Sequence, residues 1–175
     1  YSAIGWMQVA HCPNAKLLPG DMLSFRPTFL VGVPRIFEKI FAASQQKAHA
    51  SGKGRIFDRA TAVAIAYGRA LHDGGPSLLQ RAEHTVFDRL VYARLREAMG
   101  GHLRYAITGG ASLGERLGHF YAGIGLTVME GYGLTESSPV THANPFNGVR
   151  KPGHIGLPMP DTDVRIVSLE EPDRV

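Results

Sequence analysis

The chain has 175 residues, of which 44% are hydrophobic and 19% are charged, a composition typical of globular proteins. Its 19 basic and 15 acidic residues leave a formal net charge of +4, so we expect no nucleic acid as a partner. The single cysteine, Cys12, excludes an internal disulfide and fits a reducing compartment. We recognise no signal peptide and no membrane-spanning run, and we therefore expect a cytoplasmic location.

The first predicted elements alternate between strand and helix. Residues 6–10 and 28–33 are expected to be strands, the second because it is continuous and rich in β-branched residues. A short helix is predicted at 19–25. A longer helix begins at Pro34, where the missing N–H costs nothing. Its apolar face is expected to comprise Ile36, Phe37, Ile40 and Phe41.

Two more helices are predicted between glycine-containing breaks. One covers about residues 55–71 and the other about 78–99, the second with these residues facing inward: Leu79, Ala82, Val86, Leu90 and Val91. The helical insert at 35–100 holds 11 basic and six acidic residues, a net charge of 11 − 6 = +5. A solvated surface is the ordinary interpretation of this charge. Peripheral contact with an anionic membrane is the alternative.

The strand–helix alternation continues to residue 130. A strand is predicted at 103–108, a helix at 113–122 and a strand at 126–130, followed by a loop-like region and an alternating strand at 163–167. This order predicts an α/β fold with three layers, a mostly parallel sheet and right-handed helical crossovers.

The domain organisation is expected to be incomplete. We assign residues 1–160 to one large domain and residues 161–175 to the beginning of a following β subdomain. Residue 1 is not methionine, and the last residues come directly after a strand-like segment. We therefore expect these residues to be a piece of a longer protein, with an oligomeric state that the sequence leaves open.

Two glycine-containing turns follow the predicted strands at 103–108 and 126–130. The first reads TGGASL over residues 108–113, and the second reads EGYGLTES over residues 130–137. Ligands of α/β proteins bind where the carboxyl ends of neighbouring strands meet, so the two turns predict one shared pocket. Glycines allow close backbone approach, a tyrosine can stack on a base, a threonine can bond phosphate and a glutamate can hold Mg²⁺. The turns therefore favour a nucleotide site.

Residues 110–114 also match G-x-S-x-G, the pattern of a hydrolase nucleophile between a strand and a helix. The same residues fit an S-x-x-E capping box, in which Ser112 and Glu115 would bond each other's backbone amides. We favour the cap, because no aspartate is followed by a histidine downstream of Ser112. A serine hydrolase using Ser112 stays the less favoured alternative.

The motifs resemble those of adenylate-forming enzymes. Residues 132–136 resemble the Y-G-x-T-E motif of that family, and residues 108–111 are similar to its upstream G-G-A turn. Residues 33–39 resemble the V-P-R-x-x-E-K segment of long-chain fatty acid–CoA ligases, and residues 153–160 are similar to the G-x-x-G-x-P-x-P turn. The resemblance runs across nearly the whole chain and implies a central fragment of the large domain of such a ligase.

The resemblance implies roles for individual residues in binding ATP. Tyr132 would stack on the adenine, Thr135 would bond the phosphate, and Glu136 would hold Mg²⁺. Thr135 and Glu136 are the implied catalytic residues. The adenine would be lined by Gly109, Gly110 and Ala111.

The fatty acid and coenzyme A complete the implied reaction, in which ATP converts the acid to acyl-adenylate and coenzyme A then displaces AMP. Gly131 and Gly133 would leave room for the acyl carboxylate, and Val33 and Pro34 would shape the acyl side. The family's phosphate loop, ribose aspartate, hinge arginine and C-terminal lysine have no counterpart here. We therefore expect this chain alone to be inactive. A stand-alone AMP-binding module is the alternative.

Overall fold

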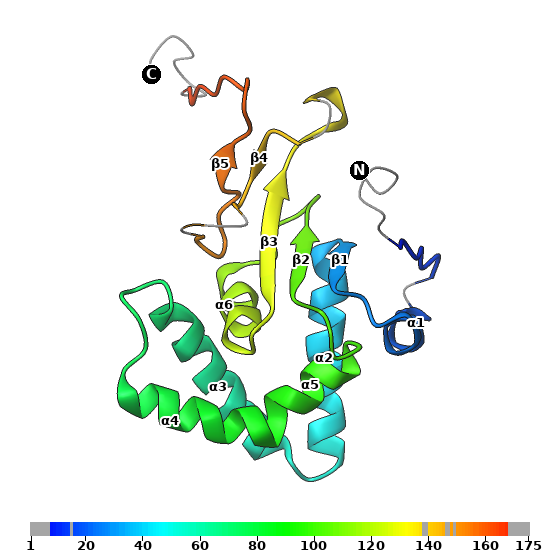
Figure 1. Cartoon of the computed structure of the whole chain (residues 1–175), viewed down its shortest axis with the longest axis vertical. Coiled ribbons are helices and arrows are strands. Elements are labelled where there is room, and N and C mark those ends of the chain that lie inside the picture. The colour runs from blue at the N-terminus through cyan, green and yellow to red at the C-terminus, as the bar shows by residue number, and fades with distance from the viewer. Residues whose placement is uncertain (1–7, 15, 138–139, 146–147, 149, 168–175) are drawn as a thin grey trace.

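The computed structural model describes residues 8–14, 16–137, 140–145, 148 and 150–167. These residues form a five-stranded sheet in the order β1-β2-β3-β4-β5, with helices in the connections (Figure 1). The predicted α/β class and the helical crossovers are therefore confirmed.

Parallel pairing is confined to the first three strands. They are β1 (Phe29–Gly32), β2 (Tyr105–Thr108) and β3 (Thr127–Tyr132), and β2 lies between the other two. Two short antiparallel strands, β4 (His142–Ala143) and β5 (Leu157–Pro158), extend the sheet beyond β3. The loop-like region thus holds two strands that the sequence did not predict.

Helices fill the crossovers between the parallel strands. The chain enters β1 from α1 (Leu18–Phe25) and reaches β2 through a series of helical segments. That series consists of α2 (Pro34–Ala50), α3 (Gly54–Ala70), α4 (Leu78–Phe87), a π-helical turn (Asp88–Tyr92) and α5 (Ala93–Ala98). A single helix, α6 (Glu115–Gly123), joins β2 to β3. Each predicted helix is therefore present with ends shifted by at most two residues, but the helix predicted at 78–99 is divided into α4, the π-helical turn and α5.

The core lies between the sheet and the helices. Phe37 of α2 packs edge-to-face against Tyr121 of α6, and the Tyr121 hydroxyl donates to the Phe37 carbonyl at 2.7 Å. The hydroxyl of Tyr92 donates in the same way to the carbonyl of Ala60 at 2.7 Å. Both tyrosines are almost fully buried, so each supplies a large apolar ring while its polar atom is satisfied.

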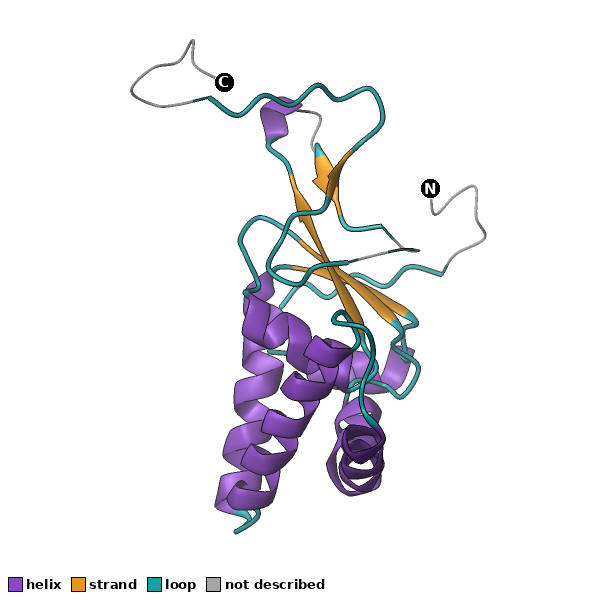
Figure 2. Ribbon diagram, turned by 90° about the vertical axis from the view of Figure 1, so that its left-hand side faces the viewer, coloured by secondary structure: helices purple, strands orange, loops and turns teal. Residues whose placement is uncertain are grey.

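The helices gather on one side of the sheet in the view of Figure 2. Alternate residues of the strands point away from them: Phe29 is 40% exposed, Val31 70% and Tyr105 41%. On β1, alternate residues therefore point away from the helices and are exposed, whereas on β3 Met129, which is in register with Ile107 and Val31, is only 2% exposed.

The segment formed by α4 and the π-helical turn presents a different face to the core than its apolar pattern predicted. Leu79, Val86 and Leu90 are 78%, 55% and 54% exposed, and Ala82 is exposed as well. The inward face instead carries polar side chains with distant partners, such as His84, whose Nε2 lies 2.6 Å from the Gly123 carbonyl oxygen. The prediction was wrong because apolar spacing identifies a stripe but not the partner that covers it. Val91 alone of the predicted set packs against the core.

Two predicted strands differ from the structure. Residues 163–167 form no regular element, because no neighbouring strand pairs with them in the described part of the chain. Of the predicted strand at 6–10, residues 6 and 7 lie outside the described residues, and residues 8–10 have no regular structure. The β subdomain expected from residue 161 stays a prediction.

None of the described helices is both long and apolar enough to cross a lipid bilayer.

Candidate functional site

The carboxyl ends of three parallel strands lie at one edge of the sheet. In the strand register, Gly32 of β1 is opposite Thr108 of β2, and Thr108 is opposite Glu130 of β3. The residues that follow each strand therefore emerge side by side. The structure thus brings the two predicted turns together, as the sequence predicted from their positions after neighbouring strands.

The backbones of Gly109 and Gly131 approach each other closely between these two turns. A Cβ atom built on Gly109 would lie 3.3 Å from the carbonyl oxygen of Gly131. The next residue, Gly110, has a φ of +81°, a conformation that side chains with a Cβ rarely adopt. Gly109 and Gly110 therefore allow a tight turn at the end of β2, and the next residue, Ala111, is exposed to solvent.

Tyr132 ends β3 and presents its ring to solvent with 46% of the residue exposed. Its ring packs edge-on against His142 of β4, with centroids 6.0 Å apart and planes at 65°. The backbone of Tyr132 is paired with that of His142 in the sheet, so the ring is held on one side while its other surface stays accessible. An accessible, supported ring is suited to stacking on a planar ligand.

Thr135 and Glu136 lie in a short 3₁₀ helix (Thr135–Ser137) directly after this tyrosine. Both side chains are exposed. The Ser137 Oγ accepts from the Leu134 amide at 2.9 Å, which closes the turn that carries them. The Thr135 hydroxyl and the Glu136 carboxylate are therefore exposed to solvent on an ordered turn, three and four residues after Tyr132.

Val33 and Pro34 follow β1 at the same edge of the sheet. Pro34 is buried at the start of α2, whereas Val33 is 53% exposed in an extended conformation. The strand register places both near the turn after β2, on the far side from β3. Gly133 continues the turn after Tyr132 and is partly buried.

Ser112 does not cap α6, so the predicted capping box is wrong. The N-cap residue is Gly114, with a φ of +81° and no side-chain bond to the helix. The Ser112 hydroxyl donates instead to the Glu130 carboxylate at 3.2 Å and accepts from the Gly114 amide at 3.2 Å. The local S-x-x-E pattern could not predict this bond, because its acceptor, Glu130, lies on a different strand. The capping box that the structure does contain lies at Ser77 and Gln80, at the start of α4.

Glu130 is the main functional candidate that the sequence did not single out. Its carboxylate is buried, with 6% of the residue exposed. One oxygen accepts from the Leu113 amide at 3.0 Å and from Ser112, and the other accepts from the Gly153 amide at 3.0 Å. The position of a glutamate at the end of an apolar strand was the available signal, because a buried carboxylate needs donors.

The turn at residues 152–156 is the second partner of Glu130. Gly153 has a φ of +81° and Gly156 a φ of +91°, and Gly156 lies against the backbone of Ala143 in β4. A Cβ atom on Gly118 of α6 would lie 2.6 Å from the Cβ of Pro152. Glycines thus allow the G-x-x-G-x-P-x-P turn to pack closely on both α6 and β4.

The described residues contain no group of three or more histidine, cysteine or acidic side chains that could hold a metal ion by themselves. Magnesium is commonly bound by one or two carboxylates together with phosphate oxygens and water. The single exposed carboxylate of Glu136 fits such a shared site, in which a nucleotide supplies the remaining ligands.

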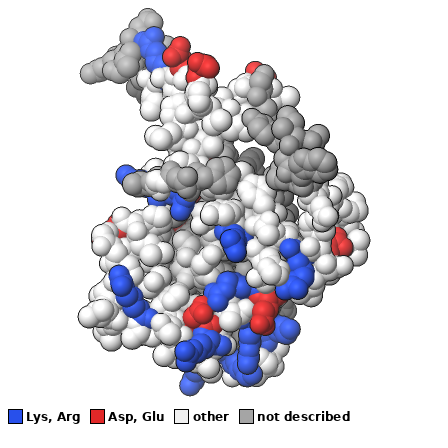
Figure 3. Space-filling view, viewed as in Figure 1, with Lys and Arg blue, Asp and Glu red and all other residues white. Residues whose placement is uncertain are grey.

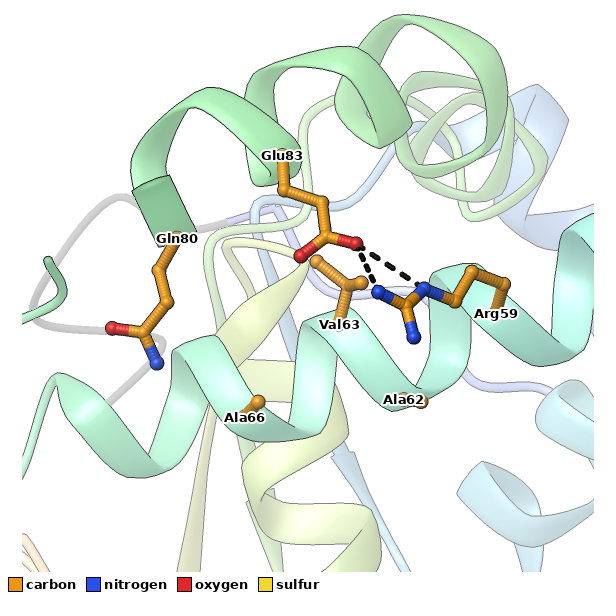
Figure 4. Close-up of a pocket in the computed structure, with 6 residues that line it drawn as sticks. All are labelled: Arg59, Ala62, Val63, Ala66, Gln80 and Glu83. Carbon is orange, nitrogen blue, oxygen red and sulfur yellow. Dashed lines mark hydrogen bonds and ion pairs between the residues drawn. The ribbon is translucent and has the colours of Figure 1, made fainter. Parts of the chain in front are cut away.

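A groove of about 250 Å³ lies elsewhere, between α3 and α4 (Figure 4). Its lining contains an ion pair in which Arg59 Nη2 lies 2.6 Å from Glu83 Oε1. None of the predicted site residues borders it, and its remaining lining consists of Ala62, Val63, Ala66 and Gln80. We therefore interpret the groove as a gap between packed helices. The strand ends remain the candidate site.

Lys and Arg side chains concentrate over the helical end of the molecule in Figure 3, with a few acidic side chains among them. Within the insert, Glu38, Glu83 and Asp88 form ion pairs with Arg35, Arg59 and Arg96, respectively. The basic surface of the insert therefore lies away from the carboxyl ends of the strands.

The fold and the two adjoining turns define an α/β protein with a ligand site at the carboxyl ends of parallel strands. Residues 2–175 match the family described as AMP-binding enzyme, and the chain belongs to that family. Its sequence is 52% identical over 152 residues to the long-chain-fatty-acid–CoA ligase FadD15 of Mycobacterium bovis, covering 86% of this chain and 25% of that protein. It is 33% identical over 164 residues to long chain acyl-CoA synthetase 2 of Arabidopsis thaliana, covering 90% of this chain and 23% of that protein.

A solved structure supports the same fold. The anthranilate CoA ligase AuaEII, in complex with anthranoyl-AMP, superposes with a TM-score of 0.53 at 16% identity, over 90% of this chain and 21% of that one. The chain thus spans about a quarter of the length of the curated relatives it matches.

Proposed function

We propose that these residues belong to a long-chain fatty acid–CoA ligase that uses ATP to activate a fatty acid. The observation that carries the proposal is the juxtaposition of the Gly109 turn and the Tyr132 turn at adjoining strand ends. The identity of 52% with a ligase of that class supports the same conclusion. The acyl substrate is therefore a long-chain carboxylate, and coenzyme A is the acceptor.

The reaction has two steps. A carboxylate oxygen of the fatty acid attacks the α-phosphorus of ATP, the bond from that phosphorus to the bridging oxygen breaks, and pyrophosphate leaves. The coenzyme A thiol then loses its proton and attacks the acyl carbon, and AMP leaves. The first step joins two anions, so it needs groups that align them and offset their charge.

The nucleotide is held by the two turns in this proposal. Gly109, Gly110 and Ala111 line one face of the adenine, where the absence of large side chains leaves the backbone accessible. Tyr132 stacks on the base, and its support by His142 keeps the ring in place. The site is thus assembled from the ends of β2 and β3.

The reacting groups lie further along the second turn. Thr135 donates its hydroxyl to phosphate, and Glu136 holds Mg²⁺ together with phosphate oxygens. The metal ion offsets the charge of the phosphates when bound. Gly131 and Gly133 leave space for the acyl carboxylate, and Val33 and Pro34 border the acyl chain at the end of β1.

The test of this function is fatty-acid-dependent ATP–pyrophosphate exchange by the full-length protein. Glu136→Gln should lower the exchange rate by about a hundredfold or more, because it removes the carboxylate that is proposed to hold the metal. Glu83→Gln, in the ion pair between α3 and α4, is the matched control and should leave the rate unchanged. AMP binding without any fatty-acid-dependent exchange would replace the ligase with a nucleotide-binding module.

The 175 residues alone should give no exchange above the level of their own Glu136→Gln variant. The family's phosphate loop and C-terminal lysine have no counterpart among them. Exchange by this chain alone would contradict the proposal that further segments complete the site. Labelling of Ser112 by a fluorophosphonate, lost in Ser112→Ala, would support the hydrolase alternative instead.

We also propose a cytoplasmic protein that contacts anionic membranes through the helical insert. The exposed stripe of α4, including Leu79 and Val86, is followed by the exposed Arg89, three residues beyond Val86. Such a combination suits a membrane surface, where apolar side chains enter the interface and arginines meet lipid phosphates. The full-length protein should sediment with vesicles of anionic lipid at low salt but not with zwitterionic ones. Sedimentation that is equal for the two lipids would contradict this contact.

A further inference from the structure

We infer that Glu130 is a positioning residue that sets the geometry of the nucleotide turn at residues 109–113. The inference rests on the proposed function, since that function places adenine against this turn. Glu130 itself is buried and does not touch the site surface, so its effect would be transmitted through the residues it holds.

Both carboxylate oxygens of Glu130 are occupied by donors from separate loops. Oε2 accepts from the Leu113 amide at 3.0 Å and from the Ser112 hydroxyl at 3.2 Å, whereas Oε1 accepts from the Gly153 amide at 3.0 Å. A carboxylate is the side-chain group that accepts at both oxygens without carrying a donor. The three bonds therefore tie two loops to the end of β3 through one side chain.

The main chain of Glu130 strengthens the same connection through Asn144. The Glu130 carbonyl accepts from the Asn144 amide and from its Nδ2, each at 3.2 Å. The same Nδ2 donates to the His154 carbonyl at 2.7 Å. Asn144 is itself only 8% exposed. The backbone of residues 153 and 154 is therefore held from both the side chain and the main chain of Glu130.

This arrangement fixes the relation between the two nucleotide turns. Ser112 and Leu113 are bonded to Glu130 at one end of the first turn, and Thr108 is paired with Glu130 in the sheet at its other end. The adenine-lining residues lie between these two attachments. The second turn begins at Gly131, directly after Glu130. A single residue thus anchors both halves of the site, and small displacements of binding groups are enough to weaken a ligand.

The discriminating variant is Glu130→Gln in the full-length protein. The amide replaces one acceptor oxygen by an NH₂ group, so at least one of the Leu113 and Gly153 amides would face a donor. We expect the dissociation constant of AMP, measured by calorimetry, to rise about tenfold, the usual scale for one lost bond to a buried charged group. The KM for ATP should rise by a similar factor. The KM for the fatty acid should change less than the nucleotide constants, because the side-chain bonds of Glu130 go to Ser112, Leu113 and Gly153 and to none of the residues assigned to the acyl group.

Two further variants separate positioning from general loss of structure. Ser112→Ala removes one donor but leaves both backbone bonds, so its effect on AMP should be smaller than that of Glu130→Gln. Glu83→Gln is the remote control and should leave AMP binding unchanged. An unchanged AMP affinity in Glu130→Gln would overturn the inference. A fall in melting temperature with unchanged AMP affinity well below that temperature would assign Glu130 to stability alone.

The outcome also distinguishes this inference from the proposed function. If the unmodified protein binds AMP but shows no fatty-acid-dependent exchange, the ligase proposal fails, and the AMP affinity of Glu130→Gln still decides the role of Glu130. If the unmodified protein binds no AMP, the inference fails with it. Fatty-acid-dependent exchange by the unmodified protein, together with a selective rise in the AMP dissociation constant and the ATP KM of Glu130→Gln, would support both the ligase proposal and the role of Glu130.

Discussion

Gly109 faces Gly131 across the ends of β2 and β3, so closely that a methyl group on Gly109 would lie 3.3 Å from the carbonyl oxygen of Gly131. That contact is tighter than an ordinary van der Waals separation. One turn would therefore have to move away from the other if a side chain were present. The proposed adenine site lies on these two turns.

Gly109→Ala is accordingly expected to weaken AMP binding while the protein stays folded. The shift needed is a few tenths of an ångström, so we expect a loss of affinity of about threefold to tenfold in calorimetry. Gly20→Ala, on a part of α1 where a Cβ atom would meet nothing within 4 Å, is the control. Equal AMP affinity in the two variants would show that the approach of the turns does not matter for the ligand.

The pair formed by Asp88 and Arg96 predicts a pH-dependent part of the stability. Arg96 donates to both carboxylate oxygens, at 2.7 and 3.1 Å, and also to the Ile124 carbonyl at 2.9 Å. The hydrogen bonds from Arg96 hold the pKa of Asp88 below its usual range, although partial burial opposes them. A lowered carboxyl pKa stabilises the fold above the pKa of the unfolded chain, about 3.9, and this contribution is lost as pH falls through the folded pKa.

Asp88→Asn should therefore lower the free energy of unfolding by about 1 kcal/mol at pH 7, a value reduced for the solvent exposure of the pair. The difference from the unmodified protein should shrink as the pH falls below about 4. Urea unfolding at several pH values would measure it. Glu38→Gln, in the exposed pair with Arg35, should change stability by less than about 0.5 kcal/mol. A constant difference across the pH range would contradict the assignment.

His72 predicts a second dependence of stability on pH, which arises from the burial of a base and not from an ion pair. Burial lowers the pKa of this imidazole, and the neighbouring His119 and Arg150 lower it further. The unfolded chain then binds a proton more readily than the folded one, so stability should decline as pH falls below about 6.5. His72→Gln should flatten this decline in thermal unfolding between pH 7.5 and 5.5. The exposed His102→Gln is the matched variant, and an equal flattening there would show that the environment of His72 is not the cause.

The contact between α3 and α6 predicts a large effect of a small substitution. A Cβ atom on Gly123 would overlap the carbonyl of Ala64, and one on Gly68 would overlap the carbonyl of His119. Gly123→Ala should therefore lower the free energy of unfolding by about 3 kcal/mol, because neither helix backbone can yield locally. Gly68→Ala should do the same. Chemical denaturation of the two variants tests this, and a loss below about 1 kcal/mol in both would mean that the helices can separate.

Sequence reasoning succeeded where the pattern is local. The continuous apolar run before Pro34 and the glycines that bound α3 depend on neighbouring residues alone, and these elements were predicted closely. The adjacency of the Gly109 and Tyr132 turns was also predictable, since strands that follow each other in sequence are usually neighbours in a sheet. The roles assigned to Thr135 and Glu136 stay predictions.

The errors occurred where distant residues decide the outcome. On the inward face of α4, His84 bonds the Gly123 carbonyl and Glu83 accepts from Arg59, and no spacing rule contains those partners. The hydroxyl of Ser112 had an adequate local partner in the helix that follows, yet it bonds Glu130 across the sheet. Glu130 was given no role of its own, because the sequence does not show which distant donors, here the Leu113 and Gly153 amides, reach its carboxylate.

The exposed face and outer edge of β1 have a practical consequence for anyone who produces these residues by themselves. No described strand pairs with the outer side of β1, and Phe29 and Val31 project from its uncovered face. An outer strand with free backbone groups and apolar side chains is a template for the addition of another chain. Recombinant preparations of this segment should therefore form soluble aggregates at high concentration. Lysine in place of Val31 is the first change to try when monodisperse material is needed.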